Sequence, residues 1–153
     1  MEFTPHSPHR LLSARPARIA GIAIVLVTFS AVLAAPVGAK SEQVIRAPSG
    51  VTYVTGGAGS EAVELLRSME RDFNLKLVFA DTTGAYLGDV KVTIVAASGQ
   101  VVLDATSEGP LLMAKLPAGA YQIEATSAGH AEHRKTTIAG NKLITVDFRW
   151  API

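Results

Sequence analysis

The chain has 153 residues, no cysteine and nearly balanced charge, with 14 Lys and Arg against 13 Asp and Glu. The lack of cysteine excludes disulfide bonds, thiolate metal sites and cysteine nucleophiles together. A net charge of +1 provides no basic excess that would indicate nucleic acid or an anionic membrane surface as a partner.

The first predicted element is an export signal over residues 1–39. Three arginines precede an uncharged apolar run at 19–35, and Val37 and Ala39 then occupy positions −3 and −1 of a signal-peptidase site. The alternative is an uncleaved anchor, but this run would rise only ~25 Å as a helix, against a hydrocarbon core of ~30 Å. We therefore predict cleavage between Ala39 and Lys40, general secretion and a periplasmic location, with an extracellular one as the alternative.

Cleavage at this position would leave 114 residues, which is enough for one small domain with a modest core. Residues 1–39 contain three Arg and one Glu, so 11 basic and 12 acidic side chains would remain, a net charge of −1. The basic balance of the precursor thus belongs to the signal. We predict no nucleic-acid partner, and membrane contact only through the signal before cleavage.

Residues 40–50 and 51–74 form the next two predicted segments. The first is polar, ends in Pro-Ser-Gly and is expected to be a flexible arm. The second contains a short alternating strand, a glycine-rich turn and an amphipathic helix, with Ser60 as the predicted N-cap and Asn74 as the stop. One stripe of this helix is expected to face a core: Ala62, Leu65 or Leu66, Met69 and Phe73.

From Leu75 onward the hydrophobic period changes from 3.6 to 2. Short alternating runs are separated by Gly or Pro at nearly every junction, which is typical of a β-sandwich. We therefore predict a mainly β fold: a seven- to eight-stranded antiparallel sandwich over residues 75–153, preceded by one helix. The positions predicted to point inward in two of its strands are Tyr121, Ile123 and Ala125, and Ile144, Val146, Phe148 and Trp150; Gln122, Glu124 and Asp147 should face solvent.

The stretches FADTTGAYLGDVKVTIVAASGQ and TSEGPLLMAKLPAGAYQIEATSAGH carry a family resemblance. The matching positions are Asp81, Gly84, Val90, Val92, Gly99, Gly109, Leu116, Pro117, Gly119, Tyr121 and Gly129. Their order resembles the carboxypeptidase regulatory-like domain, a transthyretin-like (prealbumin-like) β-sandwich, over about residues 77–150. His130 stands where that family usually has Tyr. The resemblance implies a prealbumin-like fold and an accessory role, without implying a reaction.

The segment before this domain has a separate resemblance. YVTGGAGSEAVELLRSMERDFNLKLVFA, residues 53–80, is similar to the N-terminal part of small exported proteins of Gram-negative bacteria with no assigned activity. This similarity agrees with the predicted export signal. It implies nothing about the role of residues 55–74.

The candidate catalytic groups form no recognisable constellation, and we predict a non-enzymatic protein with no catalytic residue, metal ion or cofactor. His130 and His133 are spaced as His-x-x-His, but an offset of three in a strand puts them on opposite faces, and no carboxylate is spaced to complete a zinc site. A transthyretin-like hydrolase, the hydroxyisourate hydrolase, is the least favoured alternative. That family is marked by a C-terminal Tyr-Arg-Gly-Ser, whereas this chain ends in FRWAPI.

The densest polar run after the signal is HAEHRKT at 130–136. Its basic side chains, with two tyrosines, form the predicted partner or ligand surface: His130, His133, Arg134, Lys135, Tyr86 and Tyr53. The alternative is an edge strand in which Lys, Arg and His only prevent aggregation between sheets. The predicted partner is another envelope protein. A glycan or small ligand is the alternative, with Tyr53, Tyr86 and Trp150 as its aromatic candidates.

Overall fold

The computed structural model describes residues 42–152, so the predicted export signal and its Ala39–Lys40 cleavage site lie outside the described range. Among the described residues, no helix has the length and apolar character needed to cross a membrane.

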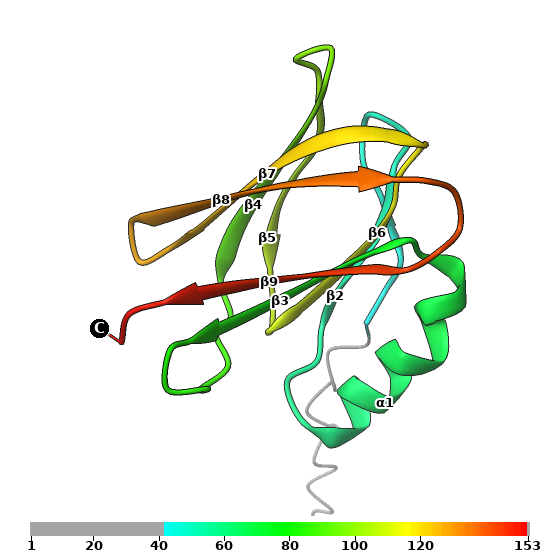
Figure 1. Cartoon of the computed structure of the whole chain (residues 1–153). Helices are drawn as coiled ribbons and strands as arrows, with labels where there is room; N and C mark the ends of the chain where they lie inside the picture. The colour runs from blue at the N-terminus through cyan, green and yellow to red at the C-terminus, as the bar shows by residue number, and fades with distance from the viewer. Residues whose placement is uncertain (1–41, 153) are drawn as a thin grey trace, which may run out of the picture. The chain divides into compact units, whose positions relative to one another are not determined.

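The described residues form nine strands in two sheets and one short α-helix (Figure 1). The first sheet has the order β1 (Ile45–Arg46), β2 (Thr52–Gly56), β6 (Leu111–Lys115), β3 (Leu75–Asp81) and β9 (Ile144–Trp150). The second has the order β5 (Val101–Ser107), β4 (Val90–Ala96), β7 (Gly119–Ser127) and β8 (His130–Ile138). The helix α1 (Ser60–Met69) and the 3-10 turn η1 (Glu70–Asp72) connect β2 to β3. The predicted mainly β fold with one N-terminal helix is confirmed.

Two features of the sheets differ from the prediction of seven or eight antiparallel strands. The additional strand is β1, at the N-terminal end. It lies within the segment 40–50, which the sequence predicts to be a flexible arm, and it pairs with β2. The pair β3 and β9 is parallel, with Leu75 opposite Ile144, whereas every other pair is antiparallel among the described strands. This direction arises because β9 follows β8 of the other sheet, so the chain crosses between sheets at 139–143 instead of making a hairpin.

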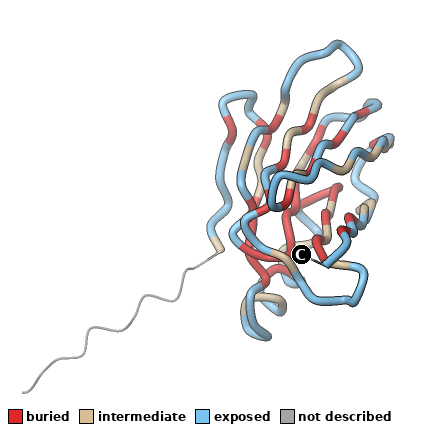
Figure 2. Tube along the Cα trace, turned by 90° about the vertical axis from the view of Figure 1, so that its left-hand side faces the viewer, coloured by how far each residue is buried: buried red, intermediate tan, exposed pale blue. Residues whose placement is uncertain are grey.

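The main core lies between the two sheets, where buried segments of both face each other (Figure 2). In β7 the predicted alternation is confirmed: Tyr121, Ile123 and Ala125 are buried, while Gln122 and Glu124 are exposed. The alternation is strict because β7 is an interior strand of its sheet, between β4 and β8, and its inner side chains pack in the core against residues of the other sheet.

The last strand follows the same pattern less completely. Phe148 and Trp150 of β9 are buried, and Asp147 is exposed, as predicted. Ile144 and Val146 share the inner face but are only half-buried. The difference has a physical reason, because β9 is an edge strand and its first half has no neighbouring strand on the open side within the described residues.

The helix α1 covers the outer face of the first sheet, where a smaller core forms. Leu66 is the buried residue of α1, whereas Leu65 is 41% exposed. Of the two leucines that the helical period allowed in the apolar stripe, Leu66 is therefore the one that faces the core. Its buried neighbours come from β2, β6 and the turn before β3: Val54, Phe73, Leu111 and Met113. The prediction of Ser60 as N-cap is wrong. An N-cap residue needs a non-helical backbone, whereas Ser60 is already the first helical residue. Gly59 is the N-cap, and since glycine has no side chain, no side chain caps the helix.

Asn74 has a larger role than the helix stop that was predicted. Its side chain is buried, with Nδ2 donating to the carbonyls of Leu116 and Gly140 at 2.7 and 2.9 Å, and Oδ1 accepting from the N–H of Leu116 at 2.8 Å. Its backbone carbonyl also accepts from the N–H of Ile144 at 3.0 Å. One side chain therefore ties the end of β6 to the crossover that leads into β9.

The Leu-Pro-x-Gly-x-Tyr stretch closes on itself in a similar way. The hydroxyl of Tyr121 donates to the carbonyl of Pro117 at 2.7 Å, so the tyrosine at the start of β7 holds the turn that precedes it. This is the geometry of a tyrosine corner, in which the ring is buried and the hydroxyl returns to the backbone a few residues upstream. Burial raises the pKa of Tyr121, which keeps the phenol protonated and able to donate.

Candidate interaction surface

The predicted polar run forms β8, and β8 adjoins β9 along the open side of the sandwich (Figure 1). Within the described residues, β8 pairs with β7 alone and β9 with β3 alone, so each strand ends its sheet. We call this line, where His130–Ile138 and Ile144–Trp150 lie next to each other without ladder hydrogen bonds, the β8–β9 seam.

The hairpin between β7 and β8 decides which side chains of β8 enter the seam. Ala128 and Gly129 have φ of 47° and 82°, as a two-residue type I′ turn requires. The resulting register sets Glu132 opposite Ala125 and Arg134 opposite Ile123. Because directly opposite residues point to the same face of a sheet, these two charged side chains face the inside of the sandwich.

Arg134 closes the middle of the seam. Its guanidinium lies 5.4 Å from the centre of the Phe148 ring, forms an ion pair with Glu132 at 3.1 Å, and donates to the carbonyl of His133 at 2.8 Å. Cation–π contact and charge-assisted hydrogen bonds hold the side chain across the strand edge. An inward-pointing charge that covers an edge carbonyl is one means by which proteins prevent strand addition.

The two histidines of the run are not brought together. His133 faces outward, opposite Glu124, and its Nδ1 lies 3.6 Å from the carboxylate, an ion pair only when the imidazole is protonated. His130 begins β8 on the other face, where its carbonyl accepts from Nε1 of Trp150 at 2.9 Å. Among residues 42–152, no group of three or more His, Asp or Glu is arranged to hold a metal ion.

A hollow of about 730 Å³ lies at the end of the seam where β8 finishes and β9 begins. Its walls are mainly apolar and hydroxyl-bearing, from the β4–β5 turn, the start of β7 and both seam strands: Val95, Ala96, Ala97, Tyr121, Thr136, Thr137 and Ile144. Lys135 is the one charged side chain among its described lining residues. We call this hollow the Lys135 groove.

The charge of Lys135 is not neutralised inside the described range, where its ammonium makes no ion pair and no side-chain hydrogen bond. Its neighbour across the ladder is Gln122, a neutral residue. The groove therefore presents one exposed cation beside an apolar surface, a combination that suits a carboxylate attached to an apolar segment.

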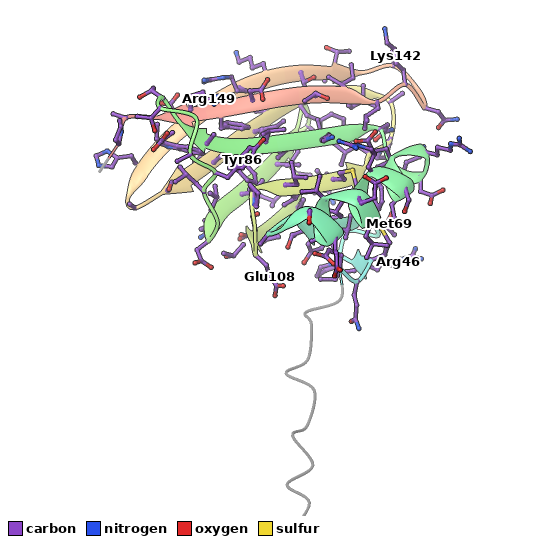
Figure 3. The ribbon with its side chains drawn as sticks, turned by 90° about the horizontal axis from the view of Figure 1, so that it is seen from below. Arg46, Met69, Tyr86, Glu108, Lys142 and Arg149 are labelled. Atoms are coloured by element: carbon purple, nitrogen blue, oxygen red, sulfur yellow. The ribbon has the colours of Figure 1, made fainter. Side chains whose placement is uncertain are left out.

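The two tyrosines predicted for the surface lie elsewhere. Tyr53 is half-buried on β2, where it packs against the main core, with β6 and β3 between it and β9. Tyr86 is 70% exposed in the loop after β3 (Figure 3). Neither lines the Lys135 groove. Of the predicted set, Lys135 alone lines this groove. Arg134 lies in the middle of the seam, His133 faces outward beside Glu124, and His130 lies at the far end of the seam, so the structure disperses the predicted surface.

Sequence reasoning missed most of the groove. The alternating pattern identifies Ile144 and Tyr121 only as core positions. No local signal marks them, because the groove exists only where strands distant in the chain end beside each other. Comparison with protein-family models and with curated proteins gives no match for this chain.

Proposed function

We propose that this protein is an exported, non-catalytic binding module of the bacterial envelope, and that an acidic segment of another envelope protein docks in the Lys135 groove. The proposed compartment rests on the signal-like residues 1–39, and the proposed accessory role on the resemblance to the carboxypeptidase regulatory-like domain. The two-sheet architecture with a tyrosine corner is compatible with a prealbumin-like sandwich.

The single observation that carries the partner's chemistry is the unpaired ammonium of Lys135 in an otherwise uncharged groove. An acidic side chain of the partner would form an ion pair with the ammonium of Lys135, and the apolar residues beside it would pack against Val95 and Ile144. Charge complementarity of this kind selects partners and speeds encounter more than it adds affinity. A transient, salt-sensitive complex is the expected result.

Docking by strand addition along the whole of β8 is less favoured. Arg134 bonds the carbonyl of His133 and lies across the middle of the edge, so a continuous ladder would have to displace its contacts with Glu132 and Phe148. The groove lies beyond this obstruction. The sequence offers edge protection and partner binding as alternative roles for β8. We propose that the middle of β8 has the first role and its end the second.

The glycan alternative draws on Tyr53, Tyr86 and Trp150. Tyr53 is half-buried and Trp150 is buried, so Tyr86 is the ring with an exposed face on which a sugar can stack. The Tyr86 ring is 70% exposed, but it lines neither of the two hollows beside the seam. A sugar stacked on Tyr86 would therefore lie outside both of these hollows. We therefore favour the protein partner.

Site-specific photocrosslinking in the producing cell tests the proposal. A benzophenone amino acid at Thr137, which lines the groove, should give one defined product, and the same probe at exposed Thr106 of β5 should not. Mass spectrometry should map the product to an acidic segment of an envelope protein. Lys135→Glu should reduce its yield about tenfold, because like charge replaces the attraction.

The matched control is Lys91→Glu, the same charge reversal at an exposed position of β4 on the same sheet. It should leave the product unchanged. Equal loss with both reversals, a product insensitive to Lys135→Glu, or a crosslinked segment without acidic residues would contradict the proposal.

A further inference from the structure

A second hollow lies at the other end of the β8–β9 seam, where β8 begins and β9 ends. Its volume is about 530 Å³, within the range of pockets that bind small molecules. Leu87, Trp150 and Pro152 give it an apolar wall, and the indole of Trp150 is held in place by its bond to the carbonyl of His130. We call it the Trp150 pocket; it shares no lining residue with the Lys135 groove.

Two carboxylates line the Trp150 pocket, each with one oxygen uncommitted. Asp81 uses Oδ1 to accept from the hydroxyl and N–H of Thr83 and from the N–H of Ala85, at 2.6 to 2.9 Å. Glu132 uses Oε2 for its ion pair with Arg134. No described residue donates a hydrogen bond to the remaining oxygen of either group.

Ser127 supplies an independent sign of a ligand. It is the last residue of β7, its side chain is nine-tenths buried, and it lines the Trp150 pocket. Its hydroxyl makes no hydrogen bond with any residue in the range 42–152. No fully buried polar side-chain atom of this range lacks a partner, so the hydroxyl of Ser127 retains some access to solvent. The Trp150 pocket is the described hollow that Ser127 lines, and we infer that the hydroxyl opens into it. A buried hydroxyl left open to a hollow can bond a guest without losing a bond within the protein.

The charge of the lining selects the class of guest. Asp81 and Glu132 are the two acidic residues of the lining, His130 is its one basic side chain, and no Lys or Arg lines the pocket among the described residues. Each of the two acids has an arginine near it. Arg134 forms an ion pair with Oε2 of Glu132 at 3.1 Å, and Nη1 of Arg149 donates to the backbone carbonyl of Asp81 at 3.4 Å. The carboxylate of Asp81 makes no ion pair with a described residue, so it carries the uncompensated negative charge of the pocket. The hydroxyl of Thr83, followed by the N–H groups of Ala85 and Thr83, lowers the pKa of Asp81, which keeps that carboxylate ionised.

We propose that the Trp150 pocket binds a small organic ammonium ion. The carboxylate of Asp81 balances its charge, the second oxygen of Glu132 and the hydroxyl of Ser127 accept its hydrogen bonds, and the apolar wall covers its carbon skeleton. This site is separate from the proposed protein-docking groove, so either proposal can fail without the other.

The chain contains a single tryptophan, and it lies in the pocket wall, so its indole ¹H–¹⁵N signal reports on occupancy directly. The purified protein is titrated with benzylamine, benzyl alcohol and benzoate, which share a ring and differ in charge. Benzylamine should shift the Trp150 signal along a saturable curve, benzyl alcohol should bind at least about tenfold more weakly, and benzoate should produce no saturable shift.

Ser127→Ala and Glu132→Gln should each weaken benzylamine binding about tenfold, because one bond to the ammonium is removed or loses its charge. Glu124→Gln is the matched control, since this carboxylate lies on the outer face of β7, and it should bind as the parent does. The amide spectrum of each variant verifies the fold, and a folded variant is required for each comparison.

The ammonium group that binds could belong to a lysine side chain of a partner protein or to a free amine. Titration with acetyl-Gly-Lys-Gly-amide, compared with benzylamine, distinguishes these two ligands. Tighter binding of the peptide than of benzylamine would assign the site to a partner's lysine, and the reverse order to a free amine. Equal binding of the three benzyl probes, no shift of the Trp150 signal with benzylamine, or equal weakening by Glu124→Gln would overturn the proposal.

Discussion

At the scale of single residues, Asn74 shows how one buried amide can hold a chain crossing in place. Its side chain makes three hydrogen bonds, two with the backbone of Leu116 and one with that of Gly140, in a site that excludes solvent. A buried amide without its partners costs free energy, so the cost of deleting this side chain exceeds the value of the bonds themselves.

We therefore expect Asn74→Ala to lower the free energy of unfolding by about 2–5 kcal/mol, because it leaves the buried N–H and carbonyl of Leu116 without their partner and removes the bond to Gly140. Asn141→Ala is the control; that side chain is exposed and bonds only Lys115, at 2.6 Å, and its loss should cost well under about 1 kcal/mol. Urea denaturation measures both. Similar costs at the two positions would mean that Asn74 does not act as described.

At the scale of elements, β7 is the strand on which register and face are most sharply defined. It lies between β4 and β8, with Ile123 buried completely and Glu124 exposed beside His133. Ile123→Ala should cost roughly 2–5 kcal/mol through lost burial and a cavity, and Glu124→Ala well under about 1 kcal/mol. Equal destabilisation in chemical denaturation would show that the register of β7 is wrong.

The helix and β8 illustrate the same scale in other ways. The helix is held by one apolar stripe around Leu66, without a side-chain cap, so its stability comes from packing on the first sheet. The strand β8 carries inward charges because it ends its sheet, where Arg134 can cover Phe148 and still reach solvent. The charged residues of β8 protect the sheet edge because of where β8 lies in the sheet, and the composition of the strand alone does not decide this.

At the scale of the whole molecule, two open edges meet along one side of the sandwich and leave a hollow at each end of their seam. The chain has no cysteine, so no disulfide can support this arrangement. The parallel pairing of β3 with β9 and the bonds of Asn74 join the beginning and the end of the sandwich instead.

Processing is a further prediction at the scale of the whole molecule. If residues 1–39 are an export signal, the protein recovered from the envelope should begin at Lys40 or a near neighbour, because Val37 and Ala39 match the cleavage pattern. Intact-mass measurement of the envelope fraction decides this. A membrane-bound species that retains residues 1–39 would contradict both the predicted cleavage and the proposed compartment.

The sequence by itself determined the type of most elements and the faces of the central strands. Alternation in β4 and β7, the helical stripe at Leu66 and the glycine or proline at each turn are local features, set by backbone geometry and by the need to bury apolar side chains. The expected opposite faces of His130 and His133 follow from the same local rule.

Only the tertiary structure decided which strands end the sheets, that β9 runs parallel to β3, and that β8 and β9 meet. Pairing depends on contacts between segments far apart in the chain, and no local period encodes them. The alternation of β7 extends to Ser127 on the inner face, but the position of this residue in one hollow with Trp150 depends on the meeting of β8 and β9. The hollows, and the chemistry proposed for them, arise where distant strands end side by side.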